Sequence, residues 1–301
     1  MQWNATGVTV AGVTGMNGSA LNKLSSPMGI YVYPNDSSLY IADTGNQRIV
    51  KWLSGAVNGT IVAGATASPG LNPTSLSKPN SVFVDSMQNM YVVDLSNGRI
   101  QFFRNGSTTA TTVSSSWTTK PDKPFCVYVM NNQIYVCDNG LNVILRNGSQ
   151  AAGKGAGPAG EIQHSQGLVV DENDTMYIAN MDHHVIVKWP ASTSYTSAGT
   201  VVAGNSVGTA GSTSILLNTP TSVTRDSQGN LYVVDQGNHR IQLFCQYPTP
   251  NTSGITIGGI GTPGSTPTAL SAPTSVALDS SLNVYVSDTG NHRIQMFQRI
   301  A

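Results

Sequence analysis

The chain has 301 residues, and only 10% of them are charged, against about 25% in typical soluble domains. Fifteen Lys and Arg balance fifteen Asp and Glu, which argues against a polybasic surface for nucleic acid or anionic membranes. The only glutamates are Glu161 and Glu172, so a helical protein with the usual Lys/Glu-rich surface is excluded. The 31 Gly and 15 Pro instead predict short strands joined by turns.

In chain order, the first predicted strand is Val8–Gly12, and six similar repeat cores follow it. Each core has three short runs with the period-2 alternation of strands, as at Val82 and Val84. Asp-Ser-x-x-Asn closes the first hairpin in the second, fifth and sixth cores, and Gly-Asn closes the second hairpin in the clearest copies. The cores span about 27–53, 79–103, 124–146, 165–189, 220–245 and 273–298.

A fourth short strand is predicted between successive cores. The clearest examples end in glycine, and the predicted segments are Ile61–Gly64, Thr111–Val113, Gln150–Gly153, Val201–Gly204 and Ile255–Gly258. Four antiparallel strands repeated six times, at about 40–55 residues each, are typical of a six-bladed β-propeller. The last core ends at Phe297 with no fourth strand after it, so we expect Val8–Gly12 to complete the last blade and close the ring.

The repeats resemble the NHL-repeat family over the whole chain. The motifs that carry the resemblance are Asp43-Thr-Gly-Asn-Gln-Arg-Ile49, Asp235-Gln-Gly-Asn-His-Arg-Ile241 and Asp288-Thr-Gly-Asn-His-Arg-Ile294. The resemblance implies one propeller domain over residues 1–301. Members of the family mainly bind proteins, and some bind RNA or a catalytic metal, so the fold does not select the function.

Asp and Arg recur five residues apart in four repeats, and we interpret them as ion pairs within hairpins rather than as catalytic groups. The pairs are Asp43 and Arg48, Asp94 and Arg99, Asp235 and Arg240, and Asp288 and Arg293. The Asp is expected to accept hydrogen bonds from turn amides, and the Arg to return to it across the hairpin. The third repeat has Asp138 with Val143, and the fourth has Asn180 with Val185.

The histidines and Glu161 offer only weak catalytic candidates. His239 and His292 share one repeat position with Gln47 and Gly98, so we expect ordinary surface turns. His183 and His184 replace the same turn in the fourth repeat, and a zinc site would need three or four convergent ligands. Glu161 lies in a Gly-rich loop from which it could reach the channel mouth, although a solvated role is more usual. We therefore predict no catalytic residue, no metal site and no cofactor, while a channel ion stays open.

The residue that follows the opening proline of each inner strand indicates whether the chain shares the channel chemistry of related enzymes. In the amidating lyase of peptide hormones, which has a similar propeller, these positions carry zinc-binding histidines. Related lactonases and strictosidine synthases place Glu, Asp and Asn in the channel. Here the six positions are Met28, Asn80, Phe125, Gln166, Thr221 and Thr274. None is His, and we predict that these uncharged side chains line the channel mouth, either binding a ligand or only plugging the channel.

Three cysteines cannot all pair with one another. Repeat comparison places Val127 rather than Cys126 opposite Cys137, so the two sulfurs are expected on opposite faces, which disfavours a disulfide. Cys245 follows a strand of the fifth repeat. We interpret all three as small buried apolar residues.

Eight Asn-x-Ser/Thr sequons are possible N-glycosylation sites. They begin at Asn4, Asn17, Asn35, Asn58, Asn105, Asn147, Asn173 and Asn251. All except Asn17 fall in loops expected on the face opposite the channel entry, where glycans would leave the entry face free. The alternative is that Asn-Gly-Ser/Thr is plain hairpin chemistry.

The function predicted from these features is a non-enzymatic binding module. Its partner would be a protein or a small neutral ligand, met by the channel mouth and by the blade-connecting loops 13–26, 65–78, 154–164, 205–219 and 260–272. The alternatives are a channel-sited metal-dependent lyase or hydrolase, and RNA binding, which the few cations disfavour. We expect a monomeric ring with no membrane span. The location is left open, with an extracellular ectodomain fragment favoured over a cytoplasmic protein.

Overall fold

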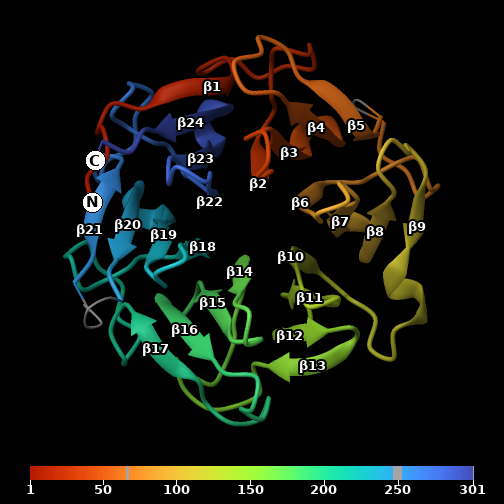
Figure 1. Cartoon of the computed structure of the whole chain (residues 1–301). Coiled ribbons are helices and arrows are strands. Elements are labelled where there is room, and N and C mark those ends of the chain that lie inside the picture. The colour runs from red at the N-terminus through yellow and green to blue at the C-terminus, as the bar shows by residue number, and fades with distance from the viewer. Residues whose placement is uncertain (66–67, 247–252, 301) are drawn as a thin grey trace.

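Six four-stranded antiparallel sheets stand around a central axis like the blades of a propeller (Figure 1). The computed structural model describes residues 1–65, 68–246 and 253–300. In the first five blades, the strands follow one another in chain order from the axis outward. The predicted all-β, six-bladed fold is confirmed.

The strands match the predicted repeat. Blade one contains β2 (Pro27–Val32), β3 (Leu39–Asp43), β4 (Arg48–Trp52) and β5 (Thr60–Gly64). Blade two contains β6 (Pro79–Val84), β7 (Met90–Asp94), β8 (Arg99–Phe103) and β9 (Ala110–Thr112). Blade three contains β10 (Pro124–Met130), β11 (Gln133–Asp138), β12 (Val143–Arg146) and β13 (Ser149–Ala152). Blade four contains β14 (Gly167–Val170), β15 (Met176–Asn180), β16 (Val185–Trp189) and β17 (Thr200–Ala203).

The last two blades complete the circle. Blade five contains β18 (Pro220–Arg225), β19 (Leu231–Asp235), β20 (Arg240–Phe244) and β21 (Ile255–Gly258). Blade six contains β22 (Ser275–Leu278), β23 (Val284–Asp288), β24 (Arg293–Phe297) and β1 (Val8–Gly12). Short 3₁₀ helices also occur: η1 (Thr44–Asn46), η2 (Leu95–Asn97), η3 (Val113–Ser116), η4 (Gln236–Asn238) and η5 (Thr289–Asn291). No helix in the described part of the chain is long and apolar enough to cross a membrane.

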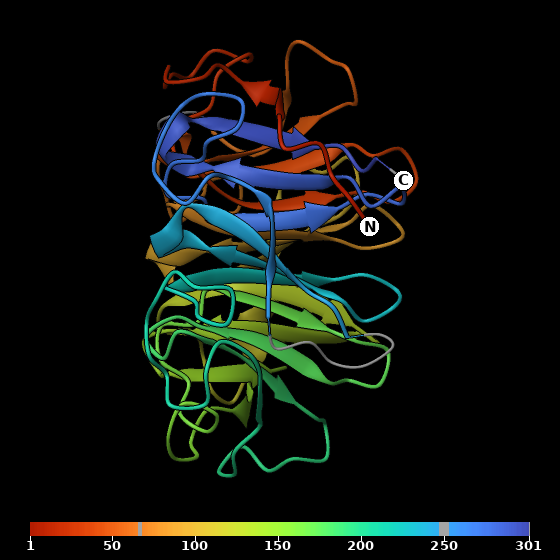
Figure 2. The same cartoon turned by 90° about the vertical axis from the view of Figure 1, so that its left-hand side faces the viewer.

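The ring is closed by the N-terminal strand, as predicted. β1 pairs antiparallel with β24, from Val8 opposite Met296 to Gly12 opposite Arg293. Before β1, the Trp3 indole is buried and its Nε1 donates to Leu282 O at 2.8 Å. The two ends of the chain therefore lie beside each other at one face of the disc (Figure 2). Main-chain hydrogen bonds thus join the first strand to the last blade.

The hydrophobic core lies between neighbouring blades. Alternating side chains point to opposite faces of each strand, so one blade contributes to two clusters. Ala42 and Ile49 of blade one pack with Val82 and Val92 of blade two. Burying each Val or Ile side chain contributes about 1.5–3 kcal/mol to the stability of the fold. This packing is therefore a major source of the free energy that holds neighbouring blades together.

Steric constraints explain why several outer strands end in glycine. Gly12 at the end of β1 has a φ of +80°, and a Cβ there would lie 2.5 Å from His292 O. Only glycine tolerates both the left-handed backbone and this close approach. The repeated Val-Ala-Gly sequence therefore marks where an outer strand leaves its blade.

The interpretation of Cys126 and Cys137 as unpaired was wrong. They lie opposite each other in β10 and β11, with their Cα atoms 5.0 Å apart, and they form a disulfide. The two-residue turn Asn131–Asn132, with both φ values positive, sets the register of this hairpin. That register pairs Val127 with Val136, and a bulge beyond Cys126 takes up the extra residue. Cys245 is free and half-buried.

Candidate functional site

Four ion pairs, each with a fully buried Asp, join the second hairpin of a blade to the loop that enters the blade. Each Arg Nε lies 2.7 Å from the Asp Oδ2. The pairs are Asp43–Arg48, Asp94–Arg99, Asp235–Arg240 and Asp288–Arg293. The Asp residues accept from an amide of the entering loop rather than from their own turn, as from Ser25 N to Asp43 Oδ1 at 2.7 Å.

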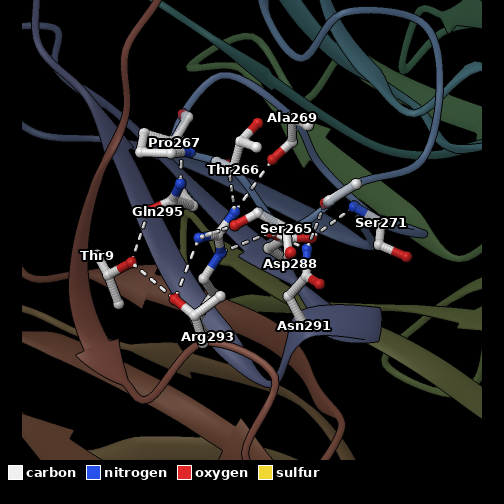
Figure 3. Close-up of polar contacts among 12 residues, drawn as sticks. Thr9, Ser265, Thr266, Pro267, Ala269, Ser271, Asp288, Asn291, Arg293 and Gln295 are labelled. Atoms are coloured by element: carbon white, nitrogen blue, oxygen red, sulfur yellow. Dashed lines mark hydrogen bonds and ion pairs between the residues drawn. The ribbon is translucent and has the colours of Figure 1, made fainter.

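Blade six shows how the charges are used (Figure 3). Asp288 accepts from Ser271 N at 2.7 Å and from Asn291 Nδ2 at 2.8 Å. Arg293, which is 2% exposed, also donates from Nη2 to Ala269 O at 3.0 Å. Burial raises the pKa of the Asp288 carboxyl, while these donors and Arg293 act in the opposite direction. Both charged groups are held by hydrogen bonds within the fold, and neither lines the axial cavity.

Blades three and four make the same connection without Arg. Asp138 accepts from its own turn, at Gly140 N and Leu141 N (both 3.0 Å), and from Asp122 N of the entering loop at 2.8 Å. In blade four, Asn180 donates from Nδ2 to Glu161 O at 2.7 Å and accepts from Gln163 N at 2.9 Å. All six blades therefore have a hydrogen-bonded link between the second hairpin and the entering loop, but only four of them use an Asp–Arg ion pair for it.

The histidine turns join neighbouring blades. At the repeat position shared by Gln47, His239 and His292, the side chain accepts a hydrogen bond from the backbone amide just before the inner strand of the next blade. The bonds are Lys78 N to Gln47 Oε1 (2.6 Å), Thr219 N to His184 Nδ1 (3.0 Å), Ala272 N to His239 Nδ1 (3.1 Å) and Ser26 N to His292 Nδ1 (3.1 Å). Burial lowers the pKa of His184, and nearby Asp182 opposes this shift. These half-buried residues are inter-blade contacts rather than the plain surface turns expected.

A cavity of about 350 Å³ lies on the axis and is lined by all six inner strands. Four of the six predicted mouth residues line it, namely Met28, Asn80, Gln166 and Thr274. Two of these also hold the ring together, because Asn80 Nδ2 donates to Phe125 O at 3.0 Å and Thr274 Oγ1 to Met28 O at 3.3 Å. Phe125 is half-buried outside the lining.

Thr221 also lies outside the lining, and it is fully buried. Its Oγ1 makes no hydrogen bond with the residues that the structure describes. Of the six mouth residues, Met28 and Gln166 combine a place in the lining with appreciable exposure. Fewer of the six mouth residues can therefore contact a ligand than the sequence suggested.

Three aromatic rings line the cavity closer to the first hairpins, where the sequence pointed to no site. Tyr31 of β2, Phe83 of β6 and Tyr128 of β10 occupy the same repeat position, and neighbouring ring centroids are 5.0 Å apart. We call these three residues the aromatic arc. A comparison of the fifth residue of each inner strand, rather than the second, would have found them.

Arg225 is the one charged side chain in the described lining of this cavity. It stands at the last position of β18, where the aligned inner strands have Val or Leu. Its Nη1 lies 3.2 Å from Glu172 Oε2, and its guanidinium lies 5.6 Å from the centroid of the Tyr177 ring. The charge is thus balanced by carboxylate before any ligand is considered.

Glu161 and the remaining histidines form a separate group beside the loop entering blade four. Glu161 accepts from Gln163 Nε2 at 2.6 Å, its Oε2 lies 3.8 Å from His183 Nε2, and it does not line the cavity. His164 Nδ1 is paired with Asp182 Oδ2. Within residues 1–65, 68–246 and 253–300, no group of three or more His, Cys, Asp and Glu could hold a metal ion.

The sequon asparagines lie on the surface. Seven of them are exposed: Asn4, Asn17, Asn35, Asn58, Asn105, Asn147 and Asn173. Asn251 lies outside the described residues, as do residues 66–67 of the loop 65–78. Asn58, Asn105 and Asn147 fall between the third and fourth strands of their blades, whereas Asn17 lies in the connection from β1 to β2. Exposure satisfies the first requirement for glycosylation and leaves its use a prediction.

Solved structures with this fold include proteins of different function. An auxiliary nutrient binding protein from Bacteroides ovatus is 16% identical, with a TM-score of 0.71 over 100% of this chain and 78% of its own. A gluconolactonase from Xanthomonas campestris is 14% identical, with a TM-score of 0.65 over 97% of both chains. Virginiamycin B lyase from Staphylococcus aureus is 13% identical, with a TM-score of 0.59 over 95% of this chain and 83% of the lyase. Identities this low show a shared fold alone.

The family comparison agrees with the repeat motifs. The family model described as NHL repeat matches residues 217–244 and 270–297. These segments contain the three inner strands of blades five and six. No curated protein matches the chain. Together with the six blades and their recurring Asp-x-Gly-Asn turns, the match supports an NHL-repeat propeller, with NHL repeats shown in blades five and six of the six-bladed ring.

Proposed function

We propose that this chain is a non-enzymatic recognition module whose partner, a protein or a small neutral ligand, binds at the channel-entry face. The observation that carries the proposal is the axial cavity of about 350 Å³, with uncharged side chains at its mouth. Binding pockets commonly measure about 300–1,000 Å³ and combine apolar walls with a few polar groups. This cavity lies at the small end of that range, which favours a small neutral ligand.

The charge distribution supports binding over chemistry in the channel. The described lining contains no carboxylate and no histidine, and its single cation, Arg225, is paired with Glu172 at 3.2 Å. General acid–base catalysis requires such titratable groups within reach of the substrate. Four further arginines are committed to ion pairs inside the blades, which also leaves few cations for an RNA-binding surface.

The disulfide and the sequons support an oxidising, secretory setting for this module. Disulfides persist mainly in extracellular and secretory compartments, and Cys126 and Cys137 form one here. Exposed sequons between third and fourth strands would place glycans on the face opposite the blade-connecting loops. Intact-mass measurement after expression in secretory cells tests this part of the proposal, and an unmodified mass would contradict it.

A ligand-observed NMR screen tests the proposed function. We expect saturation transfer to neutral ring compounds and little to matched carboxylates and amines. Gln166→Trp should remove the signal by filling the mouth, and Met87→Trp, at an exposed position of the β6–β7 hairpin, should leave it unchanged. Signals confined to charged compounds, or unaffected by the mouth variant, would contradict the proposal.

A further inference from the structure

The cavity has two unlike walls at the level of the aromatic arc. Tyr31, Phe83 and Tyr128 line one side across three consecutive blades. The same repeat position in the other three blades carries the smaller Val169, Thr224 and Ala277. The open volume therefore lies against a continuous aromatic surface, and a ligand ring with an apolar face would fit there.

Serine hydroxyls supply fixed polar groups along the same cavity. Ser81, Ser222 and Ser275 line it, and each Oγ accepts the amide of the neighbouring inner strand, at 3.3, 3.4 and 3.3 Å. A hydroxyl that accepts one such bond still has its own proton to donate. None of these three protons has an acceptor among the described residues. Hydroxyl donors thus point to a ligand that is rich in acceptors.

The tyrosine hydroxyls of the arc add donors that stay neutral. Burial is the main cause that raises the pKa of Tyr128 to about 12, with Arg225 acting against it. Burial likewise raises the pKa of Tyr31. Both hydroxyls are therefore protonated at any physiological pH, and each can donate and accept hydrogen bonds. Neither would attract or repel a charged ligand.

We propose that the cavity binds the pyranose ring of a neutral sugar, with a C–H face against the aromatic arc and hydroxyls on Ser81, Ser222 and Ser275. This inference rests on the proposed function and names its ligand class. A pyranose has both an apolar C–H face and a rim of hydroxyls, which are the two surfaces that the cavity offers. The volume of about 350 Å³ suits one ring rather than a long oligosaccharide.

Two other ligand classes fit the cavity less well. A neutral aromatic compound would contact the arc but would leave the serine donors without partners, which costs affinity in a closed site. A sugar acid would bring an uncompensated carboxylate, because Arg225 already lies 3.2 Å from Glu172 and 3.9 Å from Asp171. The observations therefore favour the neutral sugar.

The test is isothermal titration of the full chain with methyl β-D-glucopyranoside, methyl β-D-galactopyranoside and methyl α-D-mannopyranoside, beside D-glucuronate and benzyl alcohol. We expect at least one pyranoside to bind and both comparison compounds to bind more weakly. Phe83→Leu should weaken binding about two- to tenfold, the range for loss of one aromatic contact. Phe102→Leu is the matched control, because Phe102 contacts Tyr91 at the same 5.0 Å centroid distance away from the cavity.

Two further variants keep the test decisive if Phe83→Leu fails to fold. Tyr31→Phe removes only a hydroxyl and should weaken binding, and Thr224→Trp should abolish it by filling the space opposite the arc. Binding that survives Thr224→Trp, or weakens equally in Phe102→Leu, would overturn the inference. Failure of all pyranosides while other neutral compounds bind would overturn the sugar and leave the proposed function standing. Failure of every neutral compound would overturn both.

Discussion

Blades one, two, five and six differ from blades three and four in the chemistry that ties each hairpin to its entering loop. The first group uses a buried Asp–Arg pair with Nε–Oδ2 distances of 2.7 Å. Blade three uses Asp138 with backbone amides, and blade four uses the neutral Asn180. Blade three also contains the disulfide. The propeller therefore keeps the hydrogen-bonded link in every blade, whereas the ion pair is present in only four.

This comparison has an energetic basis. Removing two charges from water costs much of what their attraction returns, so a neutral arrangement of similar shape can be equally stable. Breaking one half of a buried pair is different, because it leaves a charge without a partner. The stability of the fold should therefore fall strongly when one residue of an ion pair is replaced, and much less when both residues are replaced by neutral ones.

The largest effect is expected from Arg293→Met. It leaves the buried Asp288 without its cation, and we expect the free energy of unfolding in urea to fall by about 3–5 kcal/mol. The double variant Asp288→Asn with Arg293→Val copies Asn180 and Val185 of blade four and should lose clearly less. A double variant as unstable as Arg293→Met would show that the neutral link of blade four does not transfer.

The disulfide gives a smaller effect confined to blade three. Cross-linking over 11 residues should contribute about 2–3 kcal/mol. Cys126→Ser with Cys137→Val reproduces the Ser81–Val93 pair at the same place in blade two. We expect a reductant to lower the unfolding midpoint of the wild type and not of this variant. An equal response of both proteins to the reductant would contradict the assignment.

The histidine contacts give the smallest effect, and it depends on pH. The folded state holds His184 neutral, because burial lowers its pKa below the ordinary 6.5 while Asp182 and Asp235 act against this and His183 with it. Its stabilisation is therefore full above pH 6.5 and is lost as the pH falls through the lowered value. A protonated Nδ1 also cannot accept from Thr219 N.

We expect His184→Gln to flatten the pH dependence of the melting temperature between pH 7 and pH 5, at a cost of no more than about 1 kcal/mol at neutral pH. Gln47 already makes the equivalent contact in blade one, which makes glutamine the matched replacement. Gln47→His, at the equivalent contact of blade one, is the converse control and should add a pH dependence in the same range. An unchanged acid slope in His184→Gln would show that this histidine contact does not carry the pH response.

The sequence predicted the fold well because the fold is a repeat. Six copies of one pattern fixed the blade number, and the missing fourth strand after Phe297 pointed to β1 as the closing strand. The disulfide was missed because a bulge after the opening proline, present in blade two as well as blade three, shifts the pairing by one residue and brings Cys126 opposite Cys137. Alternation alone does not reveal such a one-residue shift.

The site was harder to predict than the fold. The second residue of each inner strand drew attention, yet Asn80 and Thr274 at that position bond to neighbouring blades. The aromatic arc lies three residues further along, and its one-sidedness appears only when the blades are arranged around the axis. Arg225 was visible as a departure from an apolar repeat position, but its pairing with Glu172 of blade four needed the structure.

A crystal structure of the chain with the tightest-binding pyranoside would locate the ligand as well as detect it. We expect one sugar ring inside the axial cavity, between Phe83 and Thr224. A ring bound only on the outer strands or on the glycan-bearing loops, with the cavity holding water alone, would contradict it.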